Sequence, residues 1–184
     1  SPSKVIEYAD NSLKADKEFM IAAVENDGSA LEYASEELRD DKEVVLAALN
    51  SKTWSGSALQ YASEELKGAK EVELAAVKHS GSVLQYANKS LQSDKEFILS
   101  VIFYAGSALQ FADKKLQKDN EVVLMAVNND GSNLKFAHKS LKADKEVVLM
   151  ALKNNGSALE YVSETLKRDR DVVNLAIKNK GSAL

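Results

Sequence analysis

The sequence predicts an all-α solenoid of about seven 25-residue repeats, each made of two short antiparallel helices that stack on their neighbours. Three observations support this fold class. A Gly-Ser pair recurs with a nearly constant period, a helix-capping pattern follows each pair, and a second cap with an apolar run occupies the other half of the repeat.

The glycines mark the repeat boundaries. Successive intervals are 28 residues and then 25 residues five times, between Gly28, Gly56, Gly81, Gly106, Gly131, Gly156 and Gly181. The repeats, numbered 1 to 7 below, therefore start near residues 3, 28, 56, 81, 106, 131 and 156, and a truncated one starts at 181. We predict a single continuous array over residues 1–184. The lack of an initial Met and the final partial repeat indicate an excerpt from a longer protein.

The first half of each repeat has the pattern of a capped helix. In repeat 2, Ser29 and Glu32 have capping-box spacing, in which the serine accepts a backbone N–H and the glutamate bonds back. Repeat 6 departs from this pattern because Lys135 stands at the glutamate position. The preceding glycine suits a left-handed residue that ends the helix before it. Three apolar residues then share one face of a single helix: Leu31, Ala34 and Leu38.

The second half of each repeat opens at an aspartate, which is a good N-cap, and an acid two residues later suits the positive end of a helix. These aspartates are Asp16, Asp41, Asp94, Asp119, Asp144 and Asp169. Repeat 3 has Gly68-Ala69 instead, so its helix should start more weakly. The apolar run that follows, such as Val147–Leu152, predicts a buried helix, and its cap and Asn-Asn-Gly ending argue against a strand.

The repeat resembles a known family. The pattern Leu-x-x-Asp-Lys-Glu-Val-Val-Leu-Ala-Ala-Val, then Asn-x-Gly-x-Ala-Leu-x-Tyr-Ala-Ser-x-x-Leu, is matched at residues 38–49 and 154–166. It is similar to the family catalogued as domain of unknown function 4116, and the similarity extends over essentially the whole chain. The resemblance implies a helical repeat, often set within longer microbial proteins, and it supplies no catalytic residues.

Composition narrows the classes of function. The net charge of −4 and the pI near 5.3 argue against binding of nucleic acid through phosphate neutralisation. The apolar runs are too short to cross a membrane, and no secretion signal is visible at the N-terminus. The absence of cysteine excludes thiolate sites and favours an intracellular location.

Conspicuous repeated residues have structural interpretations. The aromatic series at Tyr33 and its equivalents is typical of packing between repeats, although ligand stacking is the alternative. His79 and His138 stand at different positions in their repeats and predict solvated polar residues rather than metal ligands. Capping alone accounts for the Asp-Lys-Glu triplets. We therefore predict no catalytic residue, no cofactor and no metal.

Departures from the period are the candidate partner-binding residues. The exposed positions of the first helix are basic in the central repeats, at Lys89, Lys114, Lys115 and Lys139, and acidic in the flanking repeats. This pattern indicates either ordinary surface variation or a docking strip for an acidic partner segment. Trp54, in the inserted loop, suits either an interface anchor or a plug for the widened joint. Phe103 and Tyr104 stand where other repeats have polar residues.

The function that these features favour is a non-catalytic protein-interaction or scaffolding module with a protein or peptide partner. Solenoids present extended surfaces, and the sequence contains no nucleophile–base pair and no phosphate-binding loop. The alternative is a structural spacer or self-associating array, because uncovered terminal repeats favour end-to-end association.

Overall fold

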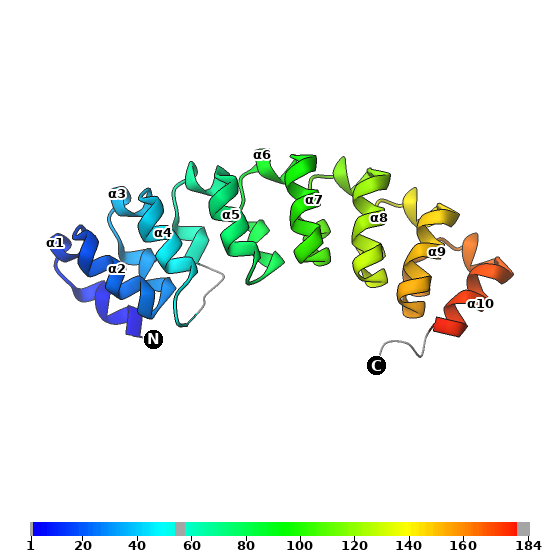
Figure 1. Ribbon diagram of the computed structural model, residues 1–184, viewed down its shortest axis with the longest axis horizontal. Helices are drawn as coiled ribbons and strands as arrows, with labels where there is room; N and C mark the ends of the chain where they lie inside the picture. The colour runs from blue at the N-terminus through cyan, green and yellow to red at the C-terminus, as the bar shows by residue number, and fades with distance from the viewer. Residues whose placement is uncertain (1, 54–57, 180–184) are drawn as a thin grey trace. The chain divides into compact units, whose positions relative to one another are not determined.

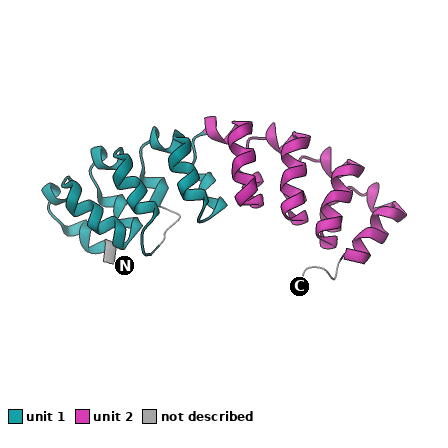
Figure 2. Ribbon diagram, viewed as in Figure 1, with its two compact units in different colours: residues 1–88 teal, residues 89–184 magenta. Residues whose placement is uncertain are grey.

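The computed structural model describes residues 2–53 and 58–179, which form two compact units, residues 1–88 and 89–184 (Figure 2). Apart from one isolated bridge between Asp27 and Thr53, the regular structure of the described residues is helical. The predicted all-α helical-repeat fold is confirmed. Continuity of the array between unit 1 and unit 2 stays a prediction.

Unit 1 contains the second helices of repeats 1 to 3, which are α2 (Lys17–Asn26), α4 (Lys42–Leu49) and α5 (Lys70–Val77) (Figure 1). Shorter segments precede them: η1 (Pro2–Tyr8), α1 (Asn11–Lys14), η2 (Gly28–Tyr33), α3 (Glu36–Arg39), η3 (Ala58–Tyr61) and η4 (Leu66–Gly68), and η5 (Gly81–Gln85) opens repeat 4. In these labels η denotes a 3₁₀ helix.

Unit 2 contains the second helices of repeats 4 to 7, which lie side by side in Figure 1: α7 (Lys95–Tyr104), α8 (Asn120–Asn129), α9 (Lys145–Asn154) and α10 (Arg170–Asn179). The shorter segments are α6 (Lys89–Gln92), η6 (Gly106–Phe111), η7 (Leu116–Lys118), η8 (Gly131–Phe136), η9 (Leu141–Ala143), η10 (Gly156–Tyr161) and η11 (Leu166–Arg168).

The first half of each repeat differs from the prediction of one continuous helix. In repeat 2 the helix is interrupted at Ala34, whose backbone is extended, and a separate turn, α3, follows. The interruption lets the Ser35 N–H donate to the Lys14 carbonyl of the preceding repeat at 2.9 Å, and the Ser35 hydroxyl then accepts the Leu38 N–H. The same bond joins Ser163 N–H to the Lys142 carbonyl in unit 2. A hydrogen bond between repeats therefore replaces one within a helix.

The predicted capping box is wrong in its cap residue. The N-cap of η2 is Asp27, one residue before the glycine, and its carboxylate accepts both the Ser29 N–H at 3.1 Å and the Ser29 hydroxyl at 2.7 Å. Asp130 caps η8 in the same way. The serine thus supports the cap instead of forming it, because the helix begins at the glycine.

The glycines also serve a different purpose from the predicted one. No glycine among the described residues has a positive φ, so none supplies a left-handed helix end. A Cβ atom on Gly28 would collide with the carbonyl oxygen of Ala48, and one on Gly131 with that of Ala151. Glycine is required here because the 3₁₀ helix approaches the second helix of its own repeat too closely for any side chain.

The caps of the second helices are confirmed. Asp41 accepts the N–H groups of Glu43 and Val44, and Asp144 makes the equivalent two bonds in α9. Ala69 has the extended backbone of a cap and makes no side-chain bond to α5. Every cap leads into a helix whose apolar side chains form the core, including Leu49, Ile102, Val127 and Leu152.

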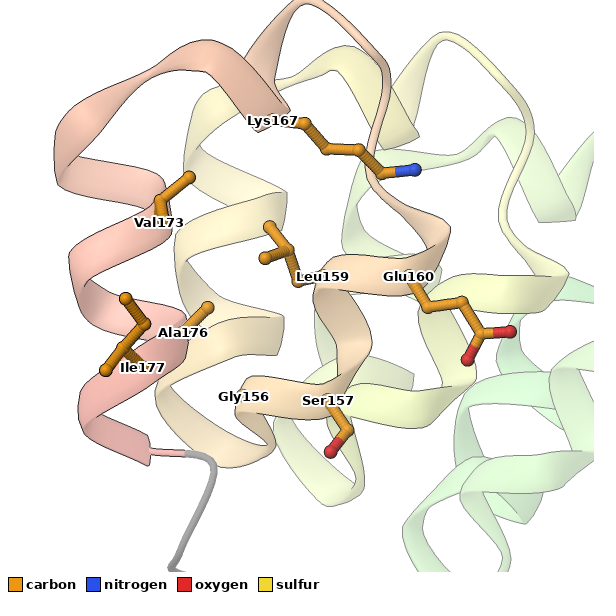
Figure 3. Close-up of a pocket in the computed structure, with 8 residues that line it drawn as sticks. All are labelled: Gly156, Ser157, Leu159, Glu160, Lys167, Val173, Ala176 and Ile177. Carbon is orange, nitrogen blue, oxygen red and sulfur yellow. The ribbon is translucent and has the colours of Figure 1, made fainter.

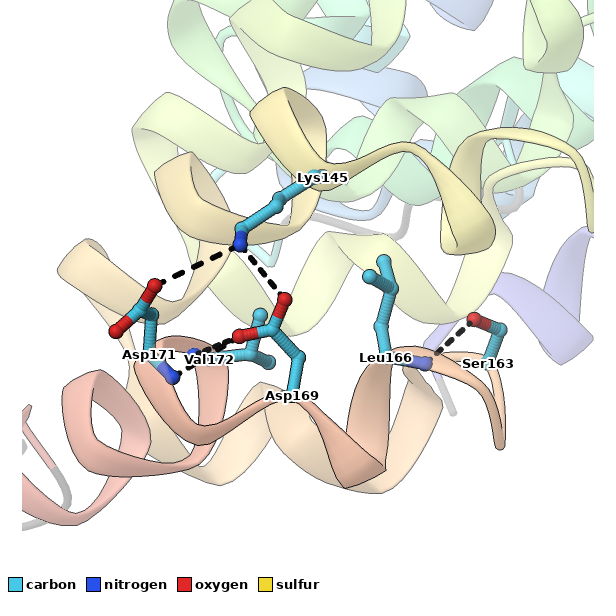
Figure 4. A network of polar contacts seen from close by, with 6 residues as sticks. All are labelled: Lys145, Ser163, Leu166, Asp169, Asp171 and Val172. Atoms are coloured by element: carbon cyan, nitrogen blue, oxygen red, sulfur yellow. Dashed lines mark hydrogen bonds and ion pairs between the residues drawn. The ribbon is translucent and has the colours of Figure 1, made fainter.

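An ion-pair ladder, which the sequence pattern did not predict, connects successive second helices. Lys145 of α9 contacts Asp169 at 2.6 Å and Asp171 at 3.7 Å, both at the start of α10 (Figure 4). The hydrogen bond between Lys145 and Asp169 is the main cause of two pKa shifts: it lowers the pKa of Asp169 and raises the pKa of Lys145. Lys17 with Asp41 and Glu43, and Lys95 with Asp119 and Glu121, repeat this arrangement. In these three triplets the lysine therefore binds the acidic start of the second helix in the next repeat, and Lys42 contacts Glu71 near the start of α5, where Ala69 replaces the aspartate cap.

Candidate functional site

An exposed aromatic pair ends helix α7. The Phe103 side chain is 71% exposed and that of Tyr104 63% exposed, and their rings meet edge to face with centroids 5.3 Å apart. The equivalent residues of repeat 6 are Lys153 and Asn154. The other large apolar side chains of α7, such as Ile98 and Ile102, are buried in the core. Two aromatic side chains exposed to solvent at its end therefore mark a candidate contact point.

A hollow of about 510 Å³ adjoins the aromatic pair. Its walls come from η6, the end of α8 and η8, and they include Gln110, Asp130, Lys135 and Phe136. The ammonium group of Lys135 lies 4.6 Å from the centroid of the Phe136 ring, which is a cation–π contact. Asp130 is engaged as the cap of η8, so Lys135 is the charge best placed to meet a ligand.

A second hollow continues from the first, because Gln110, Lys135 and Phe136 line both. Lys114 and Lys139 also line it and supply two more positive charges. The two hollows together, lined by residues from Phe103 to Lys139, are called the groove below. It combines an aromatic end with a basic end.

A buried glutamine positions one side of the groove. The Gln117 side chain is buried and donates to the carbonyls of Leu109 at 3.1 Å and Gln110 at 3.2 Å. Its carbonyl oxygen accepts a hydrogen bond from the Lys114 ammonium at 3.1 Å. The glutamine amide therefore joins η6 to a lysine on the surface, which reduces the conformational freedom of that lysine.

His138 lines the basic end of the groove and also stabilises a turn. Its Nδ1 atom lies 2.8 Å from the Ser140 hydroxyl and accepts the Ser140 N–H at 3.3 Å. The prediction of a merely solvated histidine was therefore incomplete. No cluster of acidic and histidine side chains that could hold a metal ion occurs among the described residues.

The groove unites some of the predicted partner-binding residues and leaves others outside. Phe103, Tyr104, Lys114 and Lys139 line it, while Lys89 and Lys115 are exposed in unit 2 without lining either hollow. Trp54 lies outside the described residues. Sequence reasoning missed the contribution of Lys135, although its departure from the capping-box pattern was a visible signal.

Comparison with known proteins identifies the family. The model of the family described as Domain of unknown function (DUF4116) matches residues 2–39, 16–67, 41–92, 69–102, 94–142 and 144–184. The chain belongs to this family. Neither a curated protein nor a solved structure matches the chain. Over the described part of the chain, no helix is long and apolar enough to cross a membrane.

Proposed function

We propose that this member of the family is a non-catalytic protein-interaction and scaffolding module, and that its groove binds an acidic peptide segment of a partner protein. The observation that carries the proposal is the union of the exposed Phe103–Tyr104 pair with three lysines along two connected hollows. Aromatic side chains provide large contact areas at interfaces, and surrounding charges select the partner.

The charge of the groove supports an acidic partner. Lys114, Lys135 and Lys139 line it together with a single carboxylate, Asp130, whereas the chain as a whole carries a net charge of −4. A local positive field on an acidic protein attracts acidic segments and repels cationic ones. The aromatic end suits an aromatic or aliphatic side chain of the same segment. An intracellular location stays part of this proposal.

Selection from a random peptide library displayed on phage tests the proposal. We expect the wild-type protein to enrich peptides in which acidic residues flank one aromatic or aliphatic residue. Fluorescence anisotropy then measures the affinity of an enriched peptide for two groove variants, Lys114→Glu/Lys139→Glu and Phe103→Ala/Tyr104→Ala. Each should weaken binding by about tenfold or more, which is the usual effect of losing a central contact.

Lys89→Glu/Lys115→Glu is the matched control, since it makes the same change of charge on the same compact unit outside the groove. We expect this control to retain most of the wild-type affinity, with a small loss that added salt removes. If the control loses as much affinity as the groove variants, the peptide binds through general attraction between charges, and the groove is not its binding site.

A further inference from the structure

The basic end of the groove, which is the second hollow of about 440 Å³, carries positive charge without a carboxylate to balance it. Three ammonium groups line this hollow, from Lys114, Lys135 and Lys139. No carboxylate is among the described residues that line it. Lys114 bonds to the neutral amide of Gln117, and the Lys135 ammonium lies over the Phe136 ring. The hollow therefore gathers cations whose contacts are with neutral groups.

Other repeats neutralise a lysine at the corresponding surface. In repeat 3 the Lys67 ammonium pairs with Glu64 at 2.9 Å. In repeat 7 the Lys167 ammonium, labelled in Figure 3, pairs with Glu164 at 2.8 Å. In both repeats the glutamate stands three residues before the lysine, so the two side chains meet on one side of a short helical turn. Each of these repeats therefore supplies its own counter-charge.

Repeats 5 and 6, which form the basic end, have no such glutamate. Repeat 5 has Lys114 and Gln117 at the two positions, and repeat 6 has Lys139 and Lys142. Like charges at this spacing repel each other. The Lys142 ammonium donates to the Lys135 carbonyl at 2.6 Å instead, and burial lowers the pKa of Lys142. An anion bound at the hollow would supply the counter-charge that glutamates supply in repeats 3 and 7.

An equivalent hollow in unit 1 shows that the repeat does not require these lysines. It has a volume of about 320 Å³ and lies between repeats 2 and 3. Glu36 and Glu64 line it at the positions of Lys114 and Lys139, together with the cation of Arg39. The same local geometry thus accepts carboxylates in unit 1 and ammonium groups in unit 2. Packing of the repeat therefore does not explain the lysines, which favours a role in binding.

His138 adds a neutral donor to the ammonium groups. Its Nδ1 atom accepts the Ser140 N–H, so the proton of the neutral ring is on Nε2. Because His138 lines the hollow together with Gln110, imidazole and amide N–H groups accompany the lysines there. This set of donors suits an anion with several acceptor oxygens. A phosphoryl group offers three such oxygens and a charge of about −2, whereas a carboxylate offers two oxygens and a single charge.

We propose that the basic end of the groove binds the phosphate of a phosphorylated serine or threonine in the partner segment. This inference rests on the proposed function, because it names the acidic group that the groove selects. A phosphate would balance about two of the three charges of Lys114, Lys135 and Lys139. A peptide is the occupant because the adjoining aromatic end, with Phe103 and Tyr104, suits another side chain of the same segment. The net charge of −4 disfavours attachment to an anionic membrane.

Arrays of synthetic peptides test this inference with each peptide in three forms. The flanking residues are random, and one central position carries phosphoserine, glutamate or serine. Fluorescence anisotropy then measures the affinities of all three forms of the peptides that bind best. We expect the wild-type protein to bind phosphoserine peptides about tenfold more tightly than their glutamate forms, which is the effect of one further charge-assisted hydrogen bond.

Three variants locate the phosphate. Lys114→Gln/Lys139→Gln should remove most of the preference for phosphoserine over glutamate. Lys89→Gln/Lys115→Gln is the matched control, because it removes the same charge from unit 2 outside the groove, and it should keep the preference. His138→Asn keeps a side chain that caps turns well and removes the imidazole donor, so it should weaken phosphoserine binding more than glutamate binding. Circular dichroism checks that each variant keeps its helices.

The outcomes separate this inference from the proposed function. Equal affinity for phosphoserine and glutamate peptides would overturn the inference and leave the acidic-peptide groove in place. If none of the three forms binds, the proposed function fails as well. A preference for phosphoserine that survives in Lys114→Gln/Lys139→Gln would place the phosphate elsewhere and also overturn the inference. Tighter binding to vesicles of phosphatidylcholine and phosphatidic acid than to phosphoserine peptides would overturn it in favour of a membrane surface.

Discussion

Replacement of Glu73 should stabilise unit 1 to an extent that depends on pH. Glu73 lies in α5 at the position where Val45, Val123 and Val148 form the core of other repeats. Its side chain is fully buried, and neither carboxylate oxygen has a hydrogen-bond partner among the described residues. Burial raises its pKa from 4.5 to about 8, and the Lys67 charge opposes this shift.

The raised pKa determines both the sign and the size of the effect. Between pH 4.5 and about 8 the folded protein holds the Glu73 proton while the unfolded chain releases it, so the free energy of unfolding falls as pH rises. At 1.36 kcal/mol per pKa unit, the loss reaches about 3 kcal/mol at pH 7 and about 5 kcal/mol above pH 8. Below pH 4.5 the group is neutral in both states and the loss disappears.

Glu73→Val and Glu73→Gln remove the ionisation, the first with the side chain that other repeats use and the second with a similar shape. Glu65→Gln is the control, since Glu65 is an exposed glutamate in the same repeat. Urea unfolding followed by circular dichroism, together with hydrogen exchange of the α5 amides, measures each protein across this pH range. Both Glu73 variants should gain stability over the wild type as pH rises, and the control should follow the wild type.

A stability difference between Glu73→Val and the wild type that stays constant from pH 4.5 to about 9 would refute this reasoning. It would mean that the carboxylate reaches solvent or a cation in the folded protein, so that its pKa is not raised. A gain confined to the valine variant at every pH would instead assign the effect to packing and would likewise contradict the ionisation argument.

Two further predictions concern the contacts within unit 2. Gly131→Ala should destabilise the protein by about 1–3 kcal/mol in urea unfolding, because the new methyl group meets the Ala151 carbonyl; unchanged stability would show that the backbone relaxes freely. Asn120→Lys should extend the ion-pair ladder to Asp144 and stabilise by about 0.5 kcal/mol at low salt. Lys145→Asn, which removes an existing ladder contact, should lower the free energy of unfolding by a similar amount. A change in stability that persists in high salt would exclude an ionic cause.

The proposed binding groove is predictable from the sequence only in part. Phe103 and Tyr104 break the sequence period, so the sequence alone marks them as candidates. Gln110 looks like an ordinary surface residue in the sequence, and Lys135 is visible only as a departure from the capping-box pattern. That both line one groove becomes evident only when the fold brings η6 and η8 together. Lys89 and Lys115 were predicted as partner-binding residues because they carry the same charge as Lys114 and Lys139. They lie outside the groove, since equal charge at similar repeat positions does not bring side chains into one hollow.

Local chemistry allowed the sequence alone to determine the helical repeat, its period, the aspartate caps and the buried apolar positions. A cap such as Asp41 acts on N–H groups two and three residues away, so its role is already present in the sequence. The tertiary structure decided the break at Ala34, the need for Gly131 and the partners of Lys145. Each of these depends on atoms that are distant in the sequence, in the other half of the same repeat for Gly131 and in a neighbouring repeat for Ala34 and Lys145, and only folding brings them into contact.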